Sequence, residues 1–305
     1  MMKINKPQII VLAGPTSSGK SDLAIALAKK YNGEIVSADS RQVYRGMDIG
    51  TGKVTKREQK LARHWLLDVA SPKRQYSVAQ WKRVAQRTIA DIMRRGKLPI
   101  VCGGTGFWID ALVYDAVLPD VQPNLNLRAR LNKLTTGQLF ARLQKLDPTR
   151  AASIDRQNPR RLIRALEIVL ATGKPVPPSS HRPPYHALYL AISVDPKILA
   201  QRIEQRLDAR LKTGMIKEIK NLHTSGVSWK RLESFGLEYR FVARYLQNTL
   251  TRSEMREQLL RAIIQYSKRQ MTWLKRKKEI VWLTKASPGE ASRQVADWLS
   301  LSKVA

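Results

Sequence analysis

The chain has 305 residues, of which 43% are hydrophobic, so it can bury a sizeable core as one elaborated domain or two modest ones. Its 55 lysines and arginines against 24 acidic residues give a formal net charge of +31, and self-repulsion of this size favours a polyanionic partner, nucleic acid above all, over a generally basic surface. A single cysteine, Cys102, excludes an internal disulfide and a cysteine-based metal site, and the absence of an apolar stretch long enough for a membrane helix predicts a soluble cytoplasmic protein without a membrane partner.

The N-terminal third of the chain contains three apolar segments that we interpret as strands, at Ile9–Ala13, Glu34–Ala38 and Leu98–Cys102. A helix is predicted over Ser21–Tyr31 from the spacing of its leucines and alanines, and a second apparent helix follows Gly106. Strands that alternate with helices are typical of a parallel, doubly wound sheet. The predicted fold class is therefore α/β.

The chain changes character from Asp120 to Gly173, where the pattern is helical and rich in arginine and shows no convincing strand. This part ends in the proline-rich stretch Gly173–Pro184. Alternation then resumes with a strand at Leu188–Val194, a helix at Pro196–Lys212, a long basic helix at about Ser253–Lys275 and a last strand at Ile280–Thr284. We therefore predict a core of residues 1–118 and 187–305, split by a helical insertion domain over residues 119–186.

The glycine loop after the first predicted strand reads Gly14-Pro15-Thr16-Ser17-Ser18-Gly19-Lys20-Ser21 and matches the pattern G-x-x-x-x-G-K-[ST]. In this geometry backbone N–H groups and a helix N-terminus surround a phosphate chain, Lys20 adds a positive charge, and the Ser21 hydroxyl can ligate magnesium. An ordinary glycine turn is disfavoured because the match lies between a predicted strand and a predicted helix. The sheet is therefore expected to be P-loop NTPase-like, but the motif leaves open whether the loop holds ATP, GTP or another diphosphate.

Two further residues follow predicted strands, Asp39 after the second and Thr105 after the third. Because ligands of doubly wound sheets gather at the carboxyl ends of the strands, we expect both residues beside the glycine loop. A carboxylate at Asp39 could bind magnesium indirectly, act as a general base or only cap the next turn. Thr105 lies in a glycine-rich turn that lets the backbone approach a ligand, but a turn threonine without a function fits equally well.

The long basic helix is a candidate nucleic-acid surface. Its apolar residues recur at helical spacing and are expected to be buried, which leaves the charged face exposed. The whole-chain charge excess favours a functional reading of this face over a merely solvated one. The basic residues are Arg252, Arg256, Arg261, Lys268, Arg269 and Lys275 to Lys278, with Tyr266 and Trp273 between them.

Beyond the glycine loop, a series of blocks occurs in a fixed order. They are Asp39–Thr51 (DSRQVYRGMDIGT), Arg63–Asp68 (RHWLLD), Tyr76-Ser77, Gly103–Trp108 (GGTGFW), Asn158–Ile168 (NPRRLIRALEI) and Lys268–Trp273 (KRQMTW). A lone P-loop is ambiguous, but this ordered set, which runs through most of the chain, resembles the tRNA dimethylallyltransferase family.

The resemblance implies transfer of a dimethylallyl group from dimethylallyl diphosphate to the exocyclic amine of the adenosine just 3′ of the tRNA anticodon. ATP would be neither substrate nor energy source. The loop from Gly14 to Ser21 would hold the diphosphate leaving group, with Mg²⁺ at Ser21. Asp39 would accept a hydrogen bond or proton from the attacking amine, and Thr105 and Arg128 would line the channel where the two substrates meet.

The resemblance also implies a surface for the tRNA anticodon stem-loop. It assigns RNA contacts to Asp39, Ser40, Arg41, Gln42, Arg160, Arg161, Arg164, Lys268, Arg269 and Gln270. The predicted insertion over residues 119–186 would supply part of this surface, and we expect the protein to act as a monomer.

Two blocks depart from the family pattern. Members commonly carry a Thr-Arg pair where this chain has Ile263-Ile264, so an arginine expected to contact the diphosphate is missing. The segment Ser234–Tyr239 (SFGLEY) stands where the family has a block closer to Ala-Ile-Gly-Tyr-Lys-Glu. The neighbours that could replace the missing arginine are Arg206, Arg210 and Arg261.

Three alternatives remain open from the sequence. A P-loop kinase or NTPase acting on RNA or a small metabolite would hold ATP in the same loop. An adenylate isopentenyltransferase would prenylate free nucleotides, but the large basic charge argues against it. A catalytically decayed RNA-binding protein is opposed by the intact residues Lys20, Ser21, Asp39 and Thr105.

Overall fold

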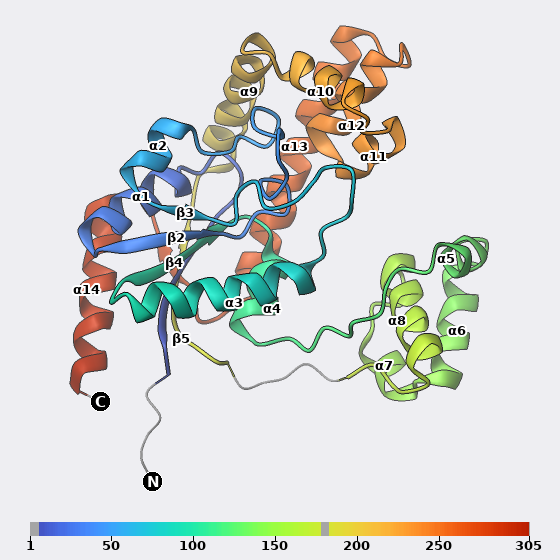
Figure 1. Ribbon diagram of the computed structural model, residues 1–305, viewed down its shortest axis with the longest axis horizontal. Helices are drawn as coiled ribbons and strands as arrows, with labels where there is room; N and C mark the ends of the chain where they lie inside the picture. Colours follow the sequence, from blue (N-terminus) through green and yellow to red (C-terminus); the bar gives the residue numbers. More distant parts are fainter. Residues whose placement is uncertain (1–5, 178–182, 305) are drawn as a thin grey trace. The chain divides into compact units, whose positions relative to one another are not determined.

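The computed structural model describes residues 6–177 and 183–304 (Figure 1). The chain divides into two compact units, a larger one of Met1–Val113 and Pro183–Ala305 and a smaller one of Tyr114–Arg182. Residues 178–182, which belong to the predicted proline-rich stretch, lie outside the described residues. That residues 119–186 act as a tRNA-binding domain stays a prediction.

The larger unit is built on a six-stranded parallel sheet with the strand order β3-β2-β4-β1-β5-β6. The strands are β1 (Gln8–Ala13), β2 (Gly33–Ser37), β3 (His64–Trp65), β4 (Leu98–Gly103), β5 (His186–Ile192) and β6 (Val281–Leu283). The α/β fold class and the predicted strands are confirmed, with shifts of one or two residues at the ends. The central position of β1 brings the loops after β1, β2 and β4 to one edge of the sheet.

Helices cover both faces of this sheet. Side chains alternate along β1, so Ile10 and Leu12 face one way and Ile9 and Val11 face the other, and all four are fully buried. Helices α1 (Lys20–Lys30) and α14 (Pro288–Val304) pack on the Ile10 face. Helices α3 (Val78–Arg94) and α4 (Gly106–Val113) pack together against β2 and β4 on the other face (Figure 1).

The remaining helices of the larger unit are α2 (Lys56–Leu61), α9 (Pro196–Lys212), α10 (Met215–Thr224), α11 (Trp229–Phe235), α12 (Leu237–Leu246) and α13 (Arg252–Lys275). Helices α9 to α13 pack against one another and form the gold and orange group in Figure 1. The predicted helix at Pro196–Lys212 is confirmed without change, and the predicted basic helix begins one residue earlier, at Arg252.

All regular secondary structure in the described part of the smaller unit is helical. It contains α5 (Leu125–Leu131), α6 (Thr136–Leu146), α7 (Pro148–Ser153) and α8 (Pro159–Thr172). Leucines of α5, α6 and α8, among them Leu131, Leu139 and Leu162, form its own buried core. The predicted helical character of this part of the chain is confirmed.

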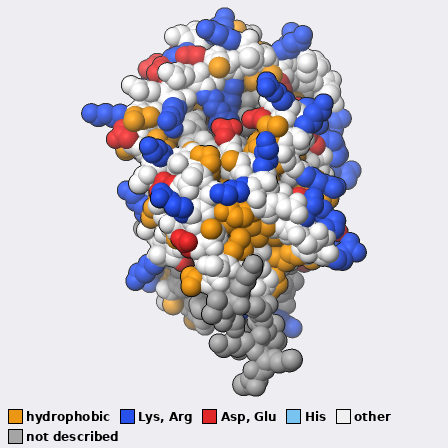
Figure 2. Space-filling model, turned by 90° about the vertical axis from the view of Figure 1, so that its left-hand side faces the viewer, with side chains coloured by type: hydrophobic (Ala, Val, Ile, Leu, Met, Phe, Trp, Pro, Cys, Tyr) orange, Lys and Arg blue, Asp and Glu red, His pale blue; other side chains and the backbone are white. Residues whose placement is uncertain are grey.

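Charge is spread over the surface. On the face drawn in Figure 2, lysine and arginine side chains are scattered between uncharged and hydrophobic areas, and acidic side chains are fewer. No helix in the described ranges is both long enough and apolar enough to span a bilayer.

Candidate active site

The glycine loop links β1 to α1 and has the backbone shape of an anion cradle. Ser17 and Gly19 adopt left-handed conformations, with φ of 61° and 89°, which turn the chain sharply before the helix. Gly19 is the N-cap of α1 and offers no side chain to the first helical N–H groups. These amides and the positive end of the helix dipole are therefore left for an anion.

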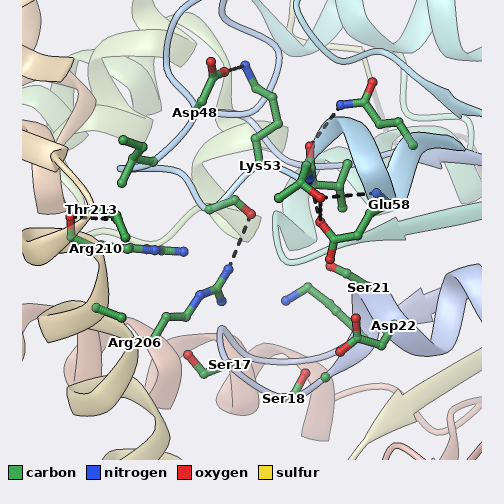
Figure 3. A pocket seen from close by; sticks show the side chains of 18 of the residues that line it. Ser17, Ser18, Ser21, Asp22, Asp48, Lys53, Glu58, Arg206, Arg210 and Thr213 are labelled. Atoms are coloured by element: carbon green, nitrogen blue, oxygen red, sulfur yellow. Dashed lines mark hydrogen bonds and ion pairs between the residues drawn. The ribbon is translucent and has the colours of Figure 1, made fainter. Parts of the chain in front are cut away.

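An open cavity of about 1000 Å³ lies against this loop (Figure 3). The loop and the start of α1 form one side of the cavity through Ser17–Asp22. Residues between Asp48 and Gln59 form a second side. The third side is α9 with its C-cap, which contribute Arg202, Gln205, Arg206, Ala209, Arg210 and the C-cap residue Thr213.

Two guanidinium groups of α9 reach into this cavity beside Gly52. Arg206 Nη2 donates a hydrogen bond to the Gly52 carbonyl at 3.4 Å, and Arg210 Nη1 donates to the Gly50 carbonyl at 3.3 Å. A Cβ atom at position 52 would lie 1.8 Å from Arg210 Nη2 and 2.2 Å from Arg206 Nη2, so glycine leaves the room that both groups occupy. Burial, together with the nearby charge of Arg210, lowers the pKa of Arg206 to about 10. An anion in the cavity would relieve this repulsion.

Lys20 adds a third positive group. Its Nζ donates to the Pro15 carbonyl at 3.1 Å, which holds the ammonium back against the loop. Burial lowers the pKa of Lys20, and the two arginines of α9 act in the same direction while Asp39 opposes them. The described structure therefore concentrates positive charge around the loop amides.

Asp39 and Thr105 meet at the same sheet edge. Asp39 Oδ1 accepts hydrogen bonds from the backbone N–H groups of Arg41 (2.8 Å) and Gln42 (3.3 Å), which fixes the carboxylate in a turn. Thr105 Oγ1 accepts a hydrogen bond from the backbone N–H of Ser40 at 3.0 Å. The residues expected after the second and third predicted strands thus lie side by side, with Asp39 close enough to Lys20 and Arg206 to affect their pKa values.

Several residues expected to contact RNA have internal partners. Gln42 bridges Ser37 and the Gly52 carbonyl, and Arg41 stacks its guanidinium over the Phe235 ring at 5.6 Å. Gln270 is buried. By contrast, the expected contact residues Lys268, Arg269, Arg160 and Arg161 are exposed.

Arg128 and Arg164 both bind a buried carboxylate within the smaller unit. Arg128 donates to both oxygens of Glu167, at 2.8 and 2.6 Å, and Arg164 donates to one of them at 2.6 Å. Burial opposes ionisation of Glu167, but these hydrogen bonds and one from the Asn124 backbone lower its pKa to about 2. These hydrogen bonds to Glu167 fix the orientation of both guanidinium groups.

The described residues contain no cluster of three or more histidine, cysteine, aspartate or glutamate side chains that could hold a metal ion. Ser21 and Asp22 line the cavity from the first turn of α1 (Figure 3). One hydroxyl together with phosphate oxygens and water is a donor set that Mg²⁺ accepts, because this ion usually keeps several waters and binds few protein ligands. The site therefore fits a metal that arrives with a diphosphate.

Comparison with known proteins identifies the family. The model of the IPP transferase family matches residues 42–277. The chain belongs to the IPP transferase family. The match includes Thr105, Arg128 and Gln270, whereas the P-loop and Asp39 precede it.

Relatives in the IPP transferase family align over nearly the whole chain. The tRNA dimethylallyltransferase of Pelotomaculum thermopropionicum is 39% identical over 285 residues, which are 91% of either chain. The tRNA dimethylallyltransferase 2 of Pelobacter propionicus is 40% identical over 268 residues, covering 88% of this chain and 85% of its own.

Solved structures show the same likeness. The tRNA isopentenylpyrophosphate transferase of Bacillus halodurans has a TM-score of 0.73 and 33% identity, with 97% of each chain covered. A eukaryotic dimethylallyltransferase acting on tRNA has a TM-score of 0.78 and 27% identity, with 92% of this chain and 74% of its own covered.

Two cavity residues of this IPP transferase, Arg202 and Lys53, were not predicted from the sequence, whereas Arg206 and Arg210 were named there as possible replacements for the missing arginine. Arg202, Arg206 and Arg210 follow one another at intervals of four, which places them on one face of a helix, and this spacing was a usable signal. Lys53 is buried and binds Asp48 and Asp68, and no local pattern indicates these partners. Of the three candidates for the missing arginine, Arg206 and Arg210 line the cavity, whereas Arg261 is exposed and pairs with Glu257.

Proposed function

We propose that this protein transfers a dimethylallyl group from dimethylallyl diphosphate to the exocyclic amine of the adenosine just 3′ of the anticodon in tRNA, with release of diphosphate. The observation that carries the proposal is the cavity in which the P-loop amides, Lys20, Arg206 and Arg210 surround space for an anion, with Asp39 close enough to affect the pKa values of Lys20 and Arg206. Membership of the IPP transferase family and relatives that are tRNA dimethylallyltransferases support it. The protein would work as a monomer in the cytoplasm.

The donor diphosphate would occupy the cradle ahead of α1. The uncapped amides of α1 and Lys20 would bind its oxygens, and Arg206 and Arg210 would supply the charge for which the family uses an arginine at the Ile264 position. Magnesium held at Ser21 would neutralise part of the charge that develops on the departing diphosphate. These groups stabilise the leaving group because they are already in place when charge builds up on it.

Asp39 would act on the acceptor. The exocyclic amine of adenine is a weak nucleophile because its lone pair is delocalised into the ring. As the nitrogen forms a bond to the allylic carbon, the bond from that carbon to the diphosphate oxygen breaks, and the electron pair leaves with the diphosphate. The proton of the amine passes to Asp39, whose Oδ1 is held by two backbone N–H groups while no described residue hydrogen-bonds to Oδ2. Thr105, which hydrogen-bonds to Ser40, would line the channel beside it.

Arg128 is proposed to act on the substrates from the smaller unit. Its Nε and Nη2 atoms bind Glu167, its side chain is 31% exposed, and no described residue accepts a hydrogen bond from Nη1. A guanidinium fixed in this way can present its remaining N–H groups to a phosphate oxygen at little entropic cost.

The tRNA would be held by contacts to its backbone, which fix position without reading sequence. The exposed residues Arg160, Arg161, Lys268 and Arg269 are the first candidates. Ser40, Arg41, Gln42, Arg164 and Gln270 complete the proposed set, and they would act close to the cavity or through the loops that they hold. The target base must leave its stack, and these contacts would offset a cost of roughly a few kcal/mol.

The test is a transfer assay. The purified protein is incubated with Mg²⁺, dimethylallyl diphosphate and unmodified tRNA without ATP, and the nucleosides are then analysed by mass. We expect prenylated adenosine from tRNA and none from free adenine nucleotides. Turnover of ATP without a prenylated product would favour a kinase or NTPase, and prenylation of free nucleotides would favour an adenylate isopentenyltransferase. RNA binding without either reaction would indicate a decayed enzyme.

A further inference from the structure

Glu238 contacts Arg210, one of the two cavity arginines, but does not itself line the cavity. It lies in the first turn of α12, and its Oε1 accepts a hydrogen bond from Arg210 Nη1 at 3.1 Å. Both side chains of this ion pair are 12% exposed. Glu238 belongs to the block Ser234–Tyr239, which departs from the family pattern that the sequence resembles.

The position of Arg210 depends on few contacts. Apart from Glu238, its guanidinium donates to the Gly50 carbonyl and packs where a side chain at Gly52 would lie. Arg206 stands one helical turn away on the same face, with its own guanidinium against Gly52. Two like charges this close repel each other, and a carboxylate that binds one of them reduces that cost.

Glu238 faces several charged or titratable groups. They are Arg206 and Arg210 of α9, Asp39 after β2, Tyr239 of α12 and Tyr266 of α13. Burial raises the pKa of Glu238, and the two arginines oppose this rise. The ion pair with Arg210 therefore offsets the cost of burying the carboxylate.

We propose that Glu238 is a positioning residue of the donor site: it holds Arg210 beside Arg206 so that both guanidinium groups already face the P-loop when a diphosphate enters. The proposal rests on the proposed function, because it takes the cavity to be the diphosphate site. A simple electrostatic view predicts the opposite effect, since removal of a negative charge near an anion site would strengthen anion binding.

The test is a double-mutant cycle on inorganic diphosphate binding, measured by titration calorimetry in the presence of Mg²⁺. The variants are Glu238→Gln, Arg210→Gln and the double substitution. Glutamine keeps the size of glutamate, which favours folded variants, but it lacks the negative charge that pairs with Arg210. We expect Glu238→Gln to weaken diphosphate binding by about fivefold to tenfold in the wild-type background and by less than about twofold in the Arg210→Gln background.

The matched control is Glu233→Gln. Glu233 pairs with Arg244 at the same distance of 3.1 Å but does not line the cavity, so its substitution should leave diphosphate affinity unchanged. In the transfer assay, Glu238→Gln should raise the KM for the donor and leave kcat and the KM for tRNA near their wild-type values. A merely structural role would lower Tm without this selective change.

Three results would overturn the proposal: tighter or unchanged diphosphate binding in Glu238→Gln, equal weakening in both backgrounds, or equal weakening in the control. The experiments distinguish failure of the role of Glu238 from failure of the proposed function. If the wild type transfers no prenyl group but the cycle shows the expected coupling, only the proposed function fails. If transfer occurs without the coupling, only the role of Glu238 fails.

Discussion

Asp39 has two roles that a substitution can separate: it stabilises a turn, and it is proposed to accept a proton. Its Oδ1 atom accepts hydrogen bonds from two backbone N–H groups, and the side-chain oxygen of an asparagine could accept the same two bonds. Only a carboxylate, however, can take up a proton from the attacking amine. Replacement of Asp39 by asparagine therefore removes the base while it preserves the turn.

We predict that Asp39→Asn lowers kcat roughly a hundredfold or more and changes tRNA affinity little, because general base catalysis is worth about 10²–10⁴ in rate. Steady-state kinetics and RNA titration measure the two effects. The control is Asp195→Asn at the N-cap of α9, where Oδ1 likewise accepts two backbone N–H groups, at 2.8 and 3.1 Å. Comparable losses of rate and tRNA affinity in Asp39→Asn would argue against a base.

Gly52 gives a second test at a single residue. Its φ of +59° is left-handed, and an added Cβ would collide with the ends of Arg206 and Arg210. Gly173 has a φ of +65° with nothing within 4 Å of such a Cβ, so Gly173→Ala carries the backbone cost alone.

We predict that Gly52→Ala raises the KM for the donor about tenfold, a change of roughly 1.4 kcal/mol, because the two guanidinium groups must move away from the P-loop. Both alanine variants should lose about 1 kcal/mol of unfolding free energy from backbone strain. Donor kinetics and urea unfolding measure these quantities. If Gly173→Ala changed the donor KM as much, or Gly52→Ala left it unchanged, the arginines would have no role in donor binding.

At the scale of elements, α13 joins two loops of the sheet edge through Gln270. The side-chain oxygen of Gln270 accepts a hydrogen bond from the Thr16 N–H at 2.9 Å, and its Nε2 donates to the Gly104 carbonyl at 2.8 Å. The resemblance assigned Gln270 to RNA contact. That contact stays a prediction, and the two hydrogen bonds show in addition a structural link between the P-loop and the loop that carries Thr105.

We predict that Gln270→Leu lowers the unfolding free energy by about 2 kcal/mol, since it leaves two polar backbone groups without a partner. It should also raise the donor KM and leave the salt dependence of tRNA binding unchanged. The control, Arg269→Ala, removes the exposed neighbour and should weaken tRNA binding without loss of stability. An equally stable Gln270→Leu with weaker tRNA binding alone would indicate that Gln270 contacts RNA directly and has no structural role.

The elements that were predictable from the sequence are those with strong local signals. Five strands, α1, α9 and α13 follow from apolar runs and helical spacing, whereas β3 has only two residues and α10 to α12 have ten or fewer each. Helix α3 was missed although Ser77 and Gln80 form a capping box at its start. Short elements are fixed by tertiary packing, which local pattern does not record.

The part of the candidate site that lies at the strand ends was predictable from the sequence, whereas the contacts made by packed helices were not. The P-loop, Asp39 and Thr105 converge because parallel strands end at one edge, so their strand positions were enough to bring them together. The contacts of Gln270 span 254 and 166 residues of sequence, and that of Glu238 with Arg210 spans 28. Such pairs depend on how helices pack, and no spacing in the chain indicates them.

At the scale of the whole molecule, the net charge of +31 has a measurable consequence. Lysine and arginine side chains are scattered over the face drawn in Figure 2, and the exposed candidates for RNA contact come from α8 and α13. If four of these groups neutralise phosphates, counterion release sets the salt dependence of binding.

We predict that the logarithm of the tRNA association constant falls with the logarithm of salt concentration with a slope of about −3. Alanine at Arg160, Arg161, Lys268 or Arg269 should reduce the slope by about 1 each. Lys29→Ala, which removes an exposed charge at the end of α1, is the control and should leave it unchanged. Filter binding at several salt concentrations measures the slope, and a flat response would remove the electrostatic argument for an RNA partner.

The central claim is that the amides ahead of α1 bind the diphosphate of an isoprenoid donor. A crystal structure of the protein with Mg²⁺ and a non-reactive thio analogue of dimethylallyl diphosphate tests it most directly. We predict both phosphates within hydrogen-bond distance of the backbone N–H groups from Gly19 to Ser21, with Arg206 and Arg210 on the opposite side and the allylic carbon toward Asp39. A diphosphate bound elsewhere, with ATP in the loop under matched conditions, would contradict the claim.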